Sequence, residues 1–446
     1  MQKISLRTFI KAQQPCFYKT LTALAKTHGP HYLVNLFGQK IVVISDNAAI
    51  RELLLKNGGK LIKGRTLSEV TAMTKGLRTI TESDGEAWSS LRSTFQSGFS
   101  KDAITQALAK IPSVMDRAIR GLAEESVKSA TDDLQDRMEK IALAMTFEMF
   151  FSYKAPCLDH LSEPEPYLEN QHYLVDQLLI RMQRTALWKY LPTPSHFRVK
   201  KVLPLNGKFL AGLAEQRRHL KNPPGDFLDL LLSMRAPDGK PLSDDQMAVH
   251  MYGIVGAAFE STGAVLHWAL CELAVRPELQ DKLRSEEPGG ENSLLQRVIF
   301  ETMRLYPPFP MLIRECREDI SSDDISITKG AFVFHLIGTS QRDPAVWGAD
   351  AAEFKPERFL NLTPEQKSSF YPFGIGKRVC MGEALVRQEL PKILSDLVRN
   401  FKFHLLNGFP EPRLRFALGP AAPTQFKFEL AHRERKLNAE AQLSTP

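Results

Sequence analysis

The chain has 446 residues, of which 43% are hydrophobic and 24% are charged, a composition typical of a soluble globular protein with a sizeable core. Its net charge is +7, but the basic residues are scattered and form no tract interleaved with aromatic residues, which argues against a nucleic-acid-binding protein. Its five cysteines stand far apart without CxxC or Cys/His spacing, so we expect neither a disulfide framework nor a zinc site, and a reducing compartment is favoured.

The first 30 residues contain no apolar run long enough for a signal peptide or a membrane span. The longest apolar stretch, 248–275, is interrupted by ionisable residues, which indicates a buried core helix. We therefore expect a cytoplasmic protein without a transmembrane anchor. The predicted organisation is an N-terminal segment with a first helix over 1–30, one domain over 31–432, and a polar tail over 433–446.

The β-rich part of this domain is predicted over about 31–82, with further strands near the C-terminus. Alternating and β-branched residues over 31–44 predict a β-hairpin. Asn47 is a candidate N-cap for a short helix that ends near Lys56. Residues 64–81 are predicted to be irregular.

The helical part of the domain is predicted over about 84–400. Its first helix opens near Asp84 and carries Trp88 and Arg92, which are four positions apart and therefore share one face. Such a pair is usually a surface feature of an amphipathic helix. From residue 102 to about 220 the pattern is helical almost throughout.

A capping box at 243–246 predicts the start of a long helix that runs to about residue 276. Helical spacing places Ala257, Ala258 and Ser261 on one face, which is almost bare of side-chain bulk. That face suits either close packing against another helix or a flat ligand lying against it.

Polar groups next to this face suggest a chemical role. If a ligand lies there, Glu260 and the hydroxyl groups of Ser261 and Thr262 stand beside it within an apolar stretch. A carboxyl group and a hydroxyl group in that position suit proton delivery.

Glu301 and Arg304 are three residues apart on the next predicted helix, where such a pair is usually a solvated salt bridge. Arg358, in a Pro-Glu-Arg-Phe sequence, is a candidate third partner. Three buried charged groups are tolerated only as a satisfied network, so we predict a structural role for this set.

Between these motifs, residues 309–313 are apolar and extended and are followed by Arg314. Residues 329–338 predict a pair of strands. A helix is predicted over 381–401, and Pro391 within it predicts a kink or a break.

The most informative stretch is a glycine-rich loop around Cys380. Phe373 and Gly374 open it, Arg378 stands two residues before the cysteine, and Gly382 follows it. A helix that begins after the cysteine stabilises a thiolate, and a thiolate in a glycine-lined loop suits an axial ligand of haem iron. The plain alternative is a buried free cysteine that packs as a small hydrophobic residue.

The frame Phe-x-x-Gly-x-x-x-Cys-x-Gly over 373–382 strongly resembles the haem-binding loop of the cytochrome P450 family, and every fixed position is present. The other motifs follow in the family's order from Trp88 onwards. The resemblance implies a mainly α fold, with one large helical domain and small β-sheets.

The resemblance also implies roles for the motif residues. Cys380 would bind the iron of haem b (iron protoporphyrin IX), and Ala257 and Ala258 would lie against the opposite face, where O2 binds. Four residues would bind the haem propionates: Trp88, Arg92, Arg314 and Arg378. Glu301, Arg304 and Arg358 would brace the loop that presents the cysteine. The chain departs from the family where Ala258 replaces Gly and where Ser261 replaces Thr.

The implied activity is that of a haem-thiolate monooxygenase that uses O2 and a separate electron-donor protein, either a ferredoxin or a flavoprotein reductase. A peroxide-driven peroxygenase or a haem-thiolate isomerase or dehydratase is the alternative, but such members often lose the acid–hydroxyl pair. A non-enzymatic haem-binding sensor is the third. Largely apolar segments in the family's variable loops suggest a hydrophobic small-molecule substrate: 64–77, 178–191, 309–313 and 418–421.

Overall fold

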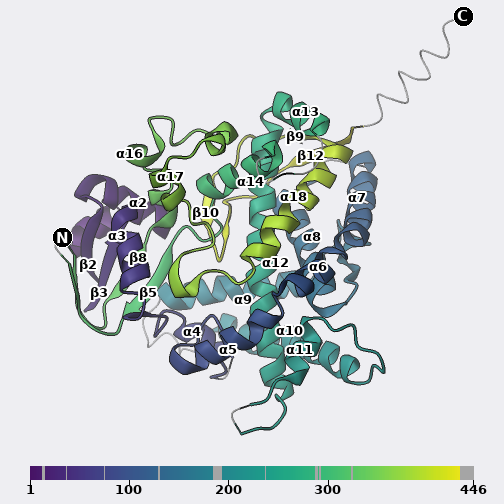
Figure 1. Ribbon diagram of the computed structural model, residues 1–446, viewed down its shortest axis with the longest axis horizontal. Helices are drawn as coiled ribbons and strands as arrows, with labels where there is room; N and C mark the ends of the chain where they lie inside the picture. Colours follow the sequence, from purple (N-terminus) through teal and green to yellow (C-terminus); the bar gives the residue numbers. More distant parts are fainter. Residues whose placement is uncertain are drawn as a thin grey trace, which may run out of the picture.

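A computed structural model describes residues 1–12, 16–36, 38–74, 76–128, 131–183, 193–236, 238–286, 290, 293–322 and 325–431. A β-sheet with its flanking helices forms one end of the molecule, and a large group of helices forms the rest (Figure 1). The predicted polar tail over 433–446 lies outside the described residues.

The main sheet has six strands within the described residues, in the order β1-β2-β3-β8-β5-β4. Their bounds are Gln2–Ile4 (β1), His31–Leu36 (β2), Gln39–Ile44 (β3), Leu61–Ile62 (β4), Leu312–Cys316 (β5) and Phe332–His335 (β8). The predicted hairpin is confirmed as the antiparallel pair β2–β3. The sheet is completed by β8, parallel to β3, and by β5, antiparallel to β8. Strands from distant parts of the sequence therefore place Arg314, on β5, beside the N-terminal region.

The helices include the long α12, which runs through the middle of the molecule (Figure 1). Their bounds are Leu6–Lys11 (α1), Phe17–His28 (α2), Asn47–Arg51 (α3), Ser68–Met73 (α4), Gly85–Ser97 (α5), Lys101–Leu108 (α6), Ile111–Lys128 (α7), Leu134–Phe151 (α8), Pro166–Gln183 (α9), Pro194–Arg218 (α10), Phe227–Ser233 (α11), Asp244–Ala274 (α12), Pro277–Ser285 (α13), Leu294–Leu305 (α14), Ile337–Ser340 (α15), Pro344–Trp347 (α16), Pro364–Ser369 (α17) and Glu383–Asn400 (α18).

The remaining strands form two-stranded antiparallel sheets. They are β6 (Ile320–Ser321) with β7 (Ser326–Ile327), β9 (Phe401–Leu405) with β12 (Phe426–Leu430), and β10 (Pro412–Leu414) with β11 (Leu418–Pro420). The structure is mainly helical with small sheets, as the sequence predicts.

The core is built around α12. The predicted capping box is present, since Ser243 and Gln246 satisfy each other's backbone N–H groups. The helix is long and apolar enough to cross a membrane, but 83% of its apolar window is buried inside the protein, as expected of a core helix. It packs closely on α8 at Gly263, where an added Cβ would lie 2.8 Å from Cγ of Glu139.

Several local predictions differ from the structure. Asp46, not Asn47, caps α3, because its carboxylate accepts a hydrogen bond from the N–H of Ala49. The segment 64–81 contains the short helix α4, and 329–338 contains one strand followed by a helix instead of two strands. Pro391 lies inside α18, which does not end there, because the neighbouring Leu390 and Ile393 are fully buried and hold the helix by packing.

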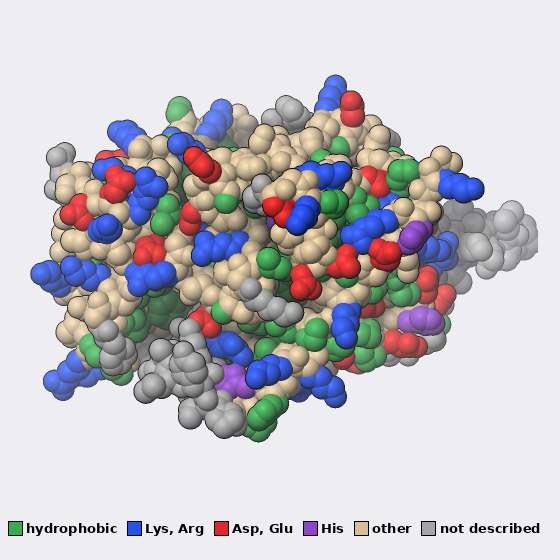
Figure 2. Space-filling model, turned by 90° about the horizontal axis from the view of Figure 1, so that it is seen from below, with side chains coloured by type: hydrophobic (Ala, Val, Ile, Leu, Met, Phe, Trp, Pro, Cys, Tyr) green, Lys and Arg blue, Asp and Glu red, His purple; other side chains and the backbone are tan. Residues whose placement is uncertain are grey.

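The charged surface is mixed. On the face shown in Figure 2, Lys and Arg side chains are distributed among acidic and neutral ones and form no continuous basic stripe. This distribution agrees with the scattered charge of the sequence.

Candidate functional site

The loop before α18 holds Cys380 in a defined position. Gly374 and Gly376 have φ angles of +75° and +76°, which non-glycine residues rarely adopt, and a Cβ at Gly376 would lie 2.6 Å from the carbonyl oxygen of Leu54. The backbone N–H of Cys380 donates to the carbonyl oxygen of Phe373 at 3.0 Å and closes the loop. The turn therefore depends on glycine at these two positions.

The sulfur of Cys380 differs from the other four in its accessibility. Cys380 is exposed, whereas the other four cysteines are buried. The pKa of its thiol is raised overall, mainly by the protein that surrounds it and also by the Glu383 carboxylate, while the N–H groups of Gly382 and Glu383 and the guanidinium of Arg92 partly offset this rise. These donors favour the thiolate, the form that binds a metal. The alternative of a buried cysteine that only packs does not fit this geometry.

Trp88, Arg92 and Arg378 come together beside this loop. The Arg92 guanidinium donates to the carbonyl oxygen of Val379 at 2.7 Å. The Arg378 guanidinium lies over the Trp88 ring, 4.3 Å from its centroid, and donates to Asp84 Oδ1 at 2.6 Å. The loop and the start of α5 therefore hold each other in place.

A second pair of cations lies close to Arg378. The side chain of Arg314 is buried, and its one hydrogen bond within the described residues goes to the carbonyl oxygen of Ile313, at 2.8 Å. Burial and the neighbouring Arg378 lower the pKa of Arg314 to about 10. Lys63 is next to both arginines, and burial together with their charges lowers its pKa to about 7. Two carboxylates lie near Lys63: Asp84, which is paired with Arg378, and Glu82, which accepts hydrogen bonds from the N–H and the hydroxyl of Thr79.

This group of cations fits an anionic ligand with two carboxylates, such as the propionates of a porphyrin. Cations with too few anionic partners are costly to hold together unless a ligand neutralises them. Trp88, Arg92, Arg314 and Arg378 are the residues that the sequence predicts for such a ligand, whereas Lys63 carries no signal in the sequence. Lys63 follows β4, and only the pairing of β4 with β5 brings it to Arg314.

The small-residue face of α12 is not covered by another helix. Ala257 is exposed and Ala258 is half-buried, although the flanking Val255 and Phe259 are fully buried. The hydroxyl of Ser261 donates to the carbonyl oxygen of Ala257 at 2.8 Å. Close helix packing, one of the two explanations left open by the sequence, is therefore excluded at Ala257.

The side chain of Glu260 lies in a different environment from the side chain of Ser261. Its side chain is 5% exposed, and its Oε1 accepts a hydrogen bond from Nε2 of Gln171 at 3.4 Å. Burial and the nearby Glu139 raise the pKa of Glu260 to about 8, so the carboxyl is protonated at neutral pH. Among the described residues, the structure does not join Glu260 to Ser261 or to the buried Thr262 by a hydrogen bond.

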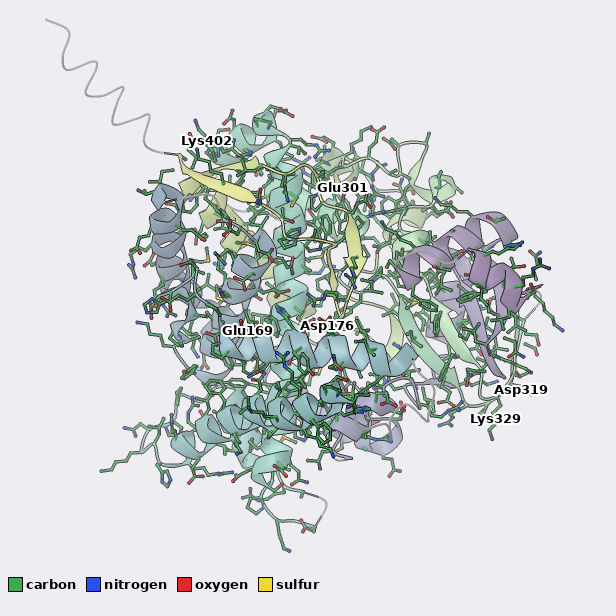
Figure 3. The ribbon with its side chains drawn as sticks, turned by 180° about the vertical axis from the view of Figure 1, so that it is seen from behind. Glu169, Asp176, Glu301, Asp319, Lys329 and Lys402 are labelled. Atoms are coloured by element: carbon green, nitrogen blue, oxygen red, sulfur yellow. The ribbon has the colours of Figure 1, made fainter. Side chains whose placement is uncertain are left out.

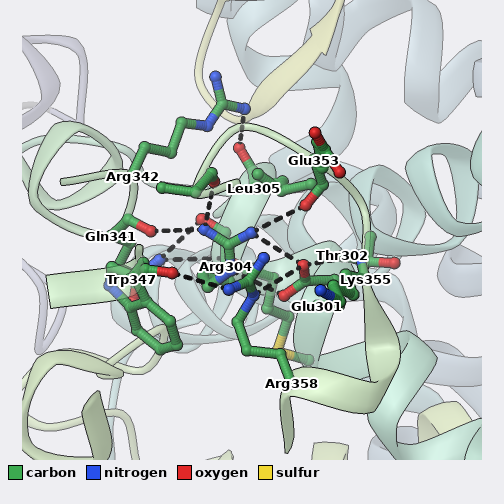
Figure 4. A network of polar contacts seen from close by, with 12 residues as sticks. Glu301, Thr302, Arg304, Leu305, Gln341, Arg342, Trp347, Glu353, Lys355 and Arg358 are labelled. Carbon is green, nitrogen blue, oxygen red and sulfur yellow. Dashed lines mark hydrogen bonds and ion pairs between the residues drawn. The ribbon is translucent and has the colours of Figure 1, made fainter. Parts of the chain in front are cut away.

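Glu301, Arg304 and Arg358 form the predicted network (Figure 4). Both side chains of the Glu301–Arg304 pair are fully buried, and the two nitrogens of Arg304 donate to the two carboxylate oxygens at 2.7 and 2.8 Å. Arg358 donates to Glu301 at 3.4 Å and to Asp350 at 3.0 Å. The backbone N–H of Lys355 donates to Glu301 at 2.9 Å, so the carboxylate is fully hydrogen-bonded.

The network connects to the cysteine loop through Gln341. Its carbonyl oxygen accepts a hydrogen bond from Arg304 at 2.9 Å, and its Oε1 accepts one from the N–H of Tyr371 at 3.2 Å. The carbonyl oxygen of Tyr371 in turn accepts a hydrogen bond from the N–H of Gly374 at 2.9 Å. The buried ion pairs therefore brace the base of the loop that carries Cys380.

Two of the predicted substrate-contacting segments lie together. The N–H of Leu418 donates to the carbonyl oxygen of Pro308 at 2.8 Å, and the rings of Phe309 and Phe416 contact edge-to-face with centroids 5.5 Å apart. Part of the predicted segment 178–191 lies outside the described residues.

A profile of the cytochrome P450 family matches residues 8–428. The chain is 35% identical to cytochrome P450 714A2 of Arabidopsis thaliana over 40% of this chain and 38% of that protein. It is 31% identical to cytochrome P450 714C3 of Oryza sativa subsp. japonica over 52% of this chain and 48% of that protein. With cytochrome P450 71A15 of Arabidopsis thaliana, the identity is 24% over 87% of this chain and 83% of that protein.

The first two of these matches span half or less of the relatives' length, whereas the family profile and the third match span most of the chain. The cysteine loop, the cations beside it and the open face of α12 agree with these similarities. The chain therefore belongs to the cytochrome P450 family, a family of haem-binding oxidoreductases.

Proposed function

We propose that this protein is a haem-thiolate monooxygenase that inserts one oxygen atom from O2 into a hydrophobic small molecule. The observation that carries the proposal is the accessible Cys380 sulfur, with the cations of the site on the same loop and on α5. Haem b fits this donor set, with Cys380 as the ligand of its iron and with Lys63, Arg92, Arg314 and Arg378 as partners of its propionates.

When bound, a thiolate-ligated haem supplies the oxygen-activation chemistry, because the sulfur donates electron density that favours O–O cleavage. The chain's own residues bind, orient and supply protons. Ala257 and Ala258 leave room against α12, and the Ser261 hydroxyl is available there as a hydrogen-bonding group. Protonated Glu260 is a proton store within one helical turn of that face.

We propose that the electrons come from a separate donor protein, a ferredoxin or a flavoprotein reductase, because the chain carries no flavin or iron–sulfur motif. Lys377 and the cations around it on the loop suit an acidic docking surface. A cytoplasmic location is part of the same proposal and rests on the widely spaced, unpaired cysteines.

The ligand assignment is tested by the absorption spectrum of the reduced protein with carbon monoxide. We expect the band diagnostic of thiolate ligation in the wild type and its loss in Cys380→Ala. Cys16→Ala, which removes a buried cysteine from α2's N-cap, is the matched control and should keep the band. A thiolate band in Cys380→Ala would overturn the assignment.

The activity is tested by turnover with a panel of lipids, terpenoids, steroids and aromatic acids. Product that requires O2 and a reductase supports the monooxygenase. Product formed with peroxide alone would instead identify a peroxygenase, and rearrangement of an oxidised lipid without electrons would identify an isomerase or dehydratase. Haem binding with no turnover under any of these conditions would favour a sensor.

A further inference from the structure

A pocket lies on the side of α12 to which Glu260 points. This pocket has a volume of about 270 Å³ and is bordered by α8, α9, α12 and the C-terminal hairpin β10–β11. Its polar lining consists of Glu260, Glu139, His172, Gln135, Arg413 and Arg415, with Asp133 at the edge. The carboxyl of Glu260 thus faces a polar pocket that is separate from the small-residue face of its own helix.

The groups in this pocket are linked and are graded in exposure. Nε2 of His172 lies 2.6 Å from Oε2 of Glu139, and the side chains are 31% and 8% exposed. The second oxygen of Glu139 accepts a hydrogen bond from Gln135 at 2.6 Å. As whole residues, Glu139 and Glu260 are 6% and 5% exposed, so both are buried. The imidazole therefore contacts solvent, and the two carboxyls lead inward from it.

Glu139 reaches this position because α12 has a glycine opposite it. At Gly263, an added Cβ would lie 2.8 Å from Cγ of Glu139 and 3.2 Å from its backbone nitrogen. The glycine allows α8 to approach within the turn that follows Glu260. The pair Glu139–Glu260 is therefore created by helix packing.

The charges around Glu260 come from every element that packs against it. Glu139 on α8 raises the pKa of Glu260, while His172 and Gln171 on α9 and Arg415 after β10 lower it. Tyr167 and Tyr252 also face Glu260, and burial raises the pKa of both hydroxyls, so they stay neutral. Arg415 is held by two hydrogen bonds to Asp176 on α9, at 2.6 and 3.1 Å. Figure 3 labels Asp176.

This balance keeps a proton on Glu260 near neutral pH and favours the protonated form of His172. The pKa of His172 is raised by its hydrogen bond to Glu139 and by the charges of Glu139 and Glu260, which outweigh its burial. Glu260 has its pKa raised to about 8. The imidazole at the entrance and the protonated carboxyl inside are therefore two groups that can hold a proton, one after the other along the pocket.

Unpartnered polar atoms indicate that water fills the pocket. Oε1 of Gln135, which lines it, and Oε1 of Gln171, which belongs to the side chain that bonds Glu260, are buried without a partner among the described residues. At about 30 Å³ per water molecule, the volume holds about nine waters. Water can therefore bridge Glu139 and Glu260, which share no direct hydrogen bond in the described residues.

We propose that His172 and Glu139 form the entrance through which protons from solvent reach Glu260. For each proton that the proposed reaction consumes, Glu260 gives up its proton and becomes a carboxylate. His172, once protonated, then gives one proton, through the pocket water beside Glu139, to that carboxylate. Neutral His172 takes a proton from bulk water, so the charge of the pocket is restored. That these protons are used in oxygen chemistry rests on the proposed monooxygenase function. That they enter the protein through His172 and Glu139 does not depend on it.

The first test follows the protonation of Glu260 after a pH jump in the haem-loaded protein, using the infrared band of its neutral carboxyl. The band is assigned by its loss in Glu260→Gln. We expect protonation to slow by about tenfold or more in His172→Phe and in Glu139→Gln. Glu169→Gln, an exposed residue of the same helix α9, is the matched control and should keep the wild-type rate (Figure 3).

Wild-type protonation rates in both His172→Phe and Glu139→Gln would overturn the proposal. His172→Gln provides a second variant if the phenylalanine disturbs folding, and the haem absorption spectrum reports on folding in each case. Titration gives an independent readout: Glu139→Gln should lower the pKa of His172 by loss of its partner and lower the pKa of Glu260 by loss of a like charge. No change in either pKa would also contradict the arrangement.

The second test uses turnover. In a wild-type protein that forms product, His172→Phe and Glu139→Gln should release several-fold more peroxide per product than Glu169→Gln does. If Glu260 is protonated slowly in these variants but the ratio of peroxide to product is unchanged, the protons that enter here are not used in the reaction. That result would overturn the catalytic part of the proposal. If the wild type forms no product with any donor, the proposed function fails, while the pH-jump result still decides whether the entrance exists.

Discussion

The guanidinium of Arg378 lies over the indole ring of Trp88, 4.3 Å from the ring centroid, and donates to Asp84 at 2.6 Å. One residue comes from the cysteine loop and the other two from the start of α5. A planar guanidinium can stack and donate in two directions at once, which the ammonium of lysine cannot do. This contact therefore fixes the cysteine loop and the cation of Arg378 to the start of α5.

The first prediction is that Arg378→Lys weakens haem binding. Loss of the stacked, hydrogen-bonded cation should reduce haem affinity by about tenfold, equivalent to about 1.4 kcal/mol. The measurement is the transfer of haem to an apo-globin acceptor. Arg399→Lys, at an exposed position near the end of α18, should leave the transfer unchanged. Equal transfer from both variants would show that Arg378 does not hold the haem.

The second prediction concerns the buried network. Glu301→Gln leaves the Arg304 guanidinium, which is fully buried, without its charge partner, and should destabilise the folded protein by about 3–5 kcal/mol. Urea unfolding of the haem-loaded protein measures the change. Glu215→Gln removes an exposed carboxylate that pairs with Arg218 at 2.5 Å and should have little effect. A similar small change in both variants would mean that the network is not needed for stability.

The third prediction tests the close approach of α8 and α12. Gly263→Ala places a methyl group within 2.8 Å of Glu139 and should destabilise the protein by about 1–3 kcal/mol in thermal unfolding. Gly212→Ala, on α10 with nothing within 4 Å of the new methyl group, should instead stabilise it by about 0.5–1 kcal/mol. Stabilisation by both changes would contradict the close packing at Gly263.

The fourth prediction is a pH dependence of stability caused by Glu389 on α18. Burial raises the pKa of this carboxyl to about 8 in the folded protein, whereas the unfolded chain titrates near 4.5. The folded state therefore holds a proton that the unfolded state has lost, and this contribution is lost as the pH rises from about 4.5 towards 8, with a slope of up to about 1.4 kcal/mol per pH unit.

Glu389→Gln should remove that loss. The variant and the wild type should have similar free energies of unfolding at pH 5, and the variant should be the more stable of the two at pH 8. Urea unfolding at a series of pH values measures both curves. Parallel curves would show that Glu389 ionises normally in the folded protein.

Local sequence signals predicted the elements whose cause is local. The hairpin β2–β3 follows from alternating β-branched residues, and the start of α12 follows from the Ser243–Gln246 capping box. The same signals were less accurate where two neighbours compete, as at the cap of α3, which Asp46 occupies instead of Asn47. Packing overrode local preference at Pro391, where buried neighbours keep α18 continuous.

The same distinction between local and long-range causes applies to the residues of the candidate site. Cys380 and the glycines of its loop, together with the spacing of Trp88 and Arg92, were readable because each motif is contiguous or lies on one helix. Lys63 carries no local signal, since its role depends on the pairing of β4 with β5. His172 and Glu139 likewise meet Glu260 only because separate helices cross.

The sequence by itself therefore determined the family frame, the cysteine proposed as the thiolate ligand and the helix that carries the acid and the hydroxyls. Only the tertiary structure decided which charges surround Glu260 and Arg314, and hence how their pKa values differ from the ordinary ones. The physical reason is that backbone conformation depends on neighbours in the chain, whereas burial and electrostatic interaction depend on neighbours in space.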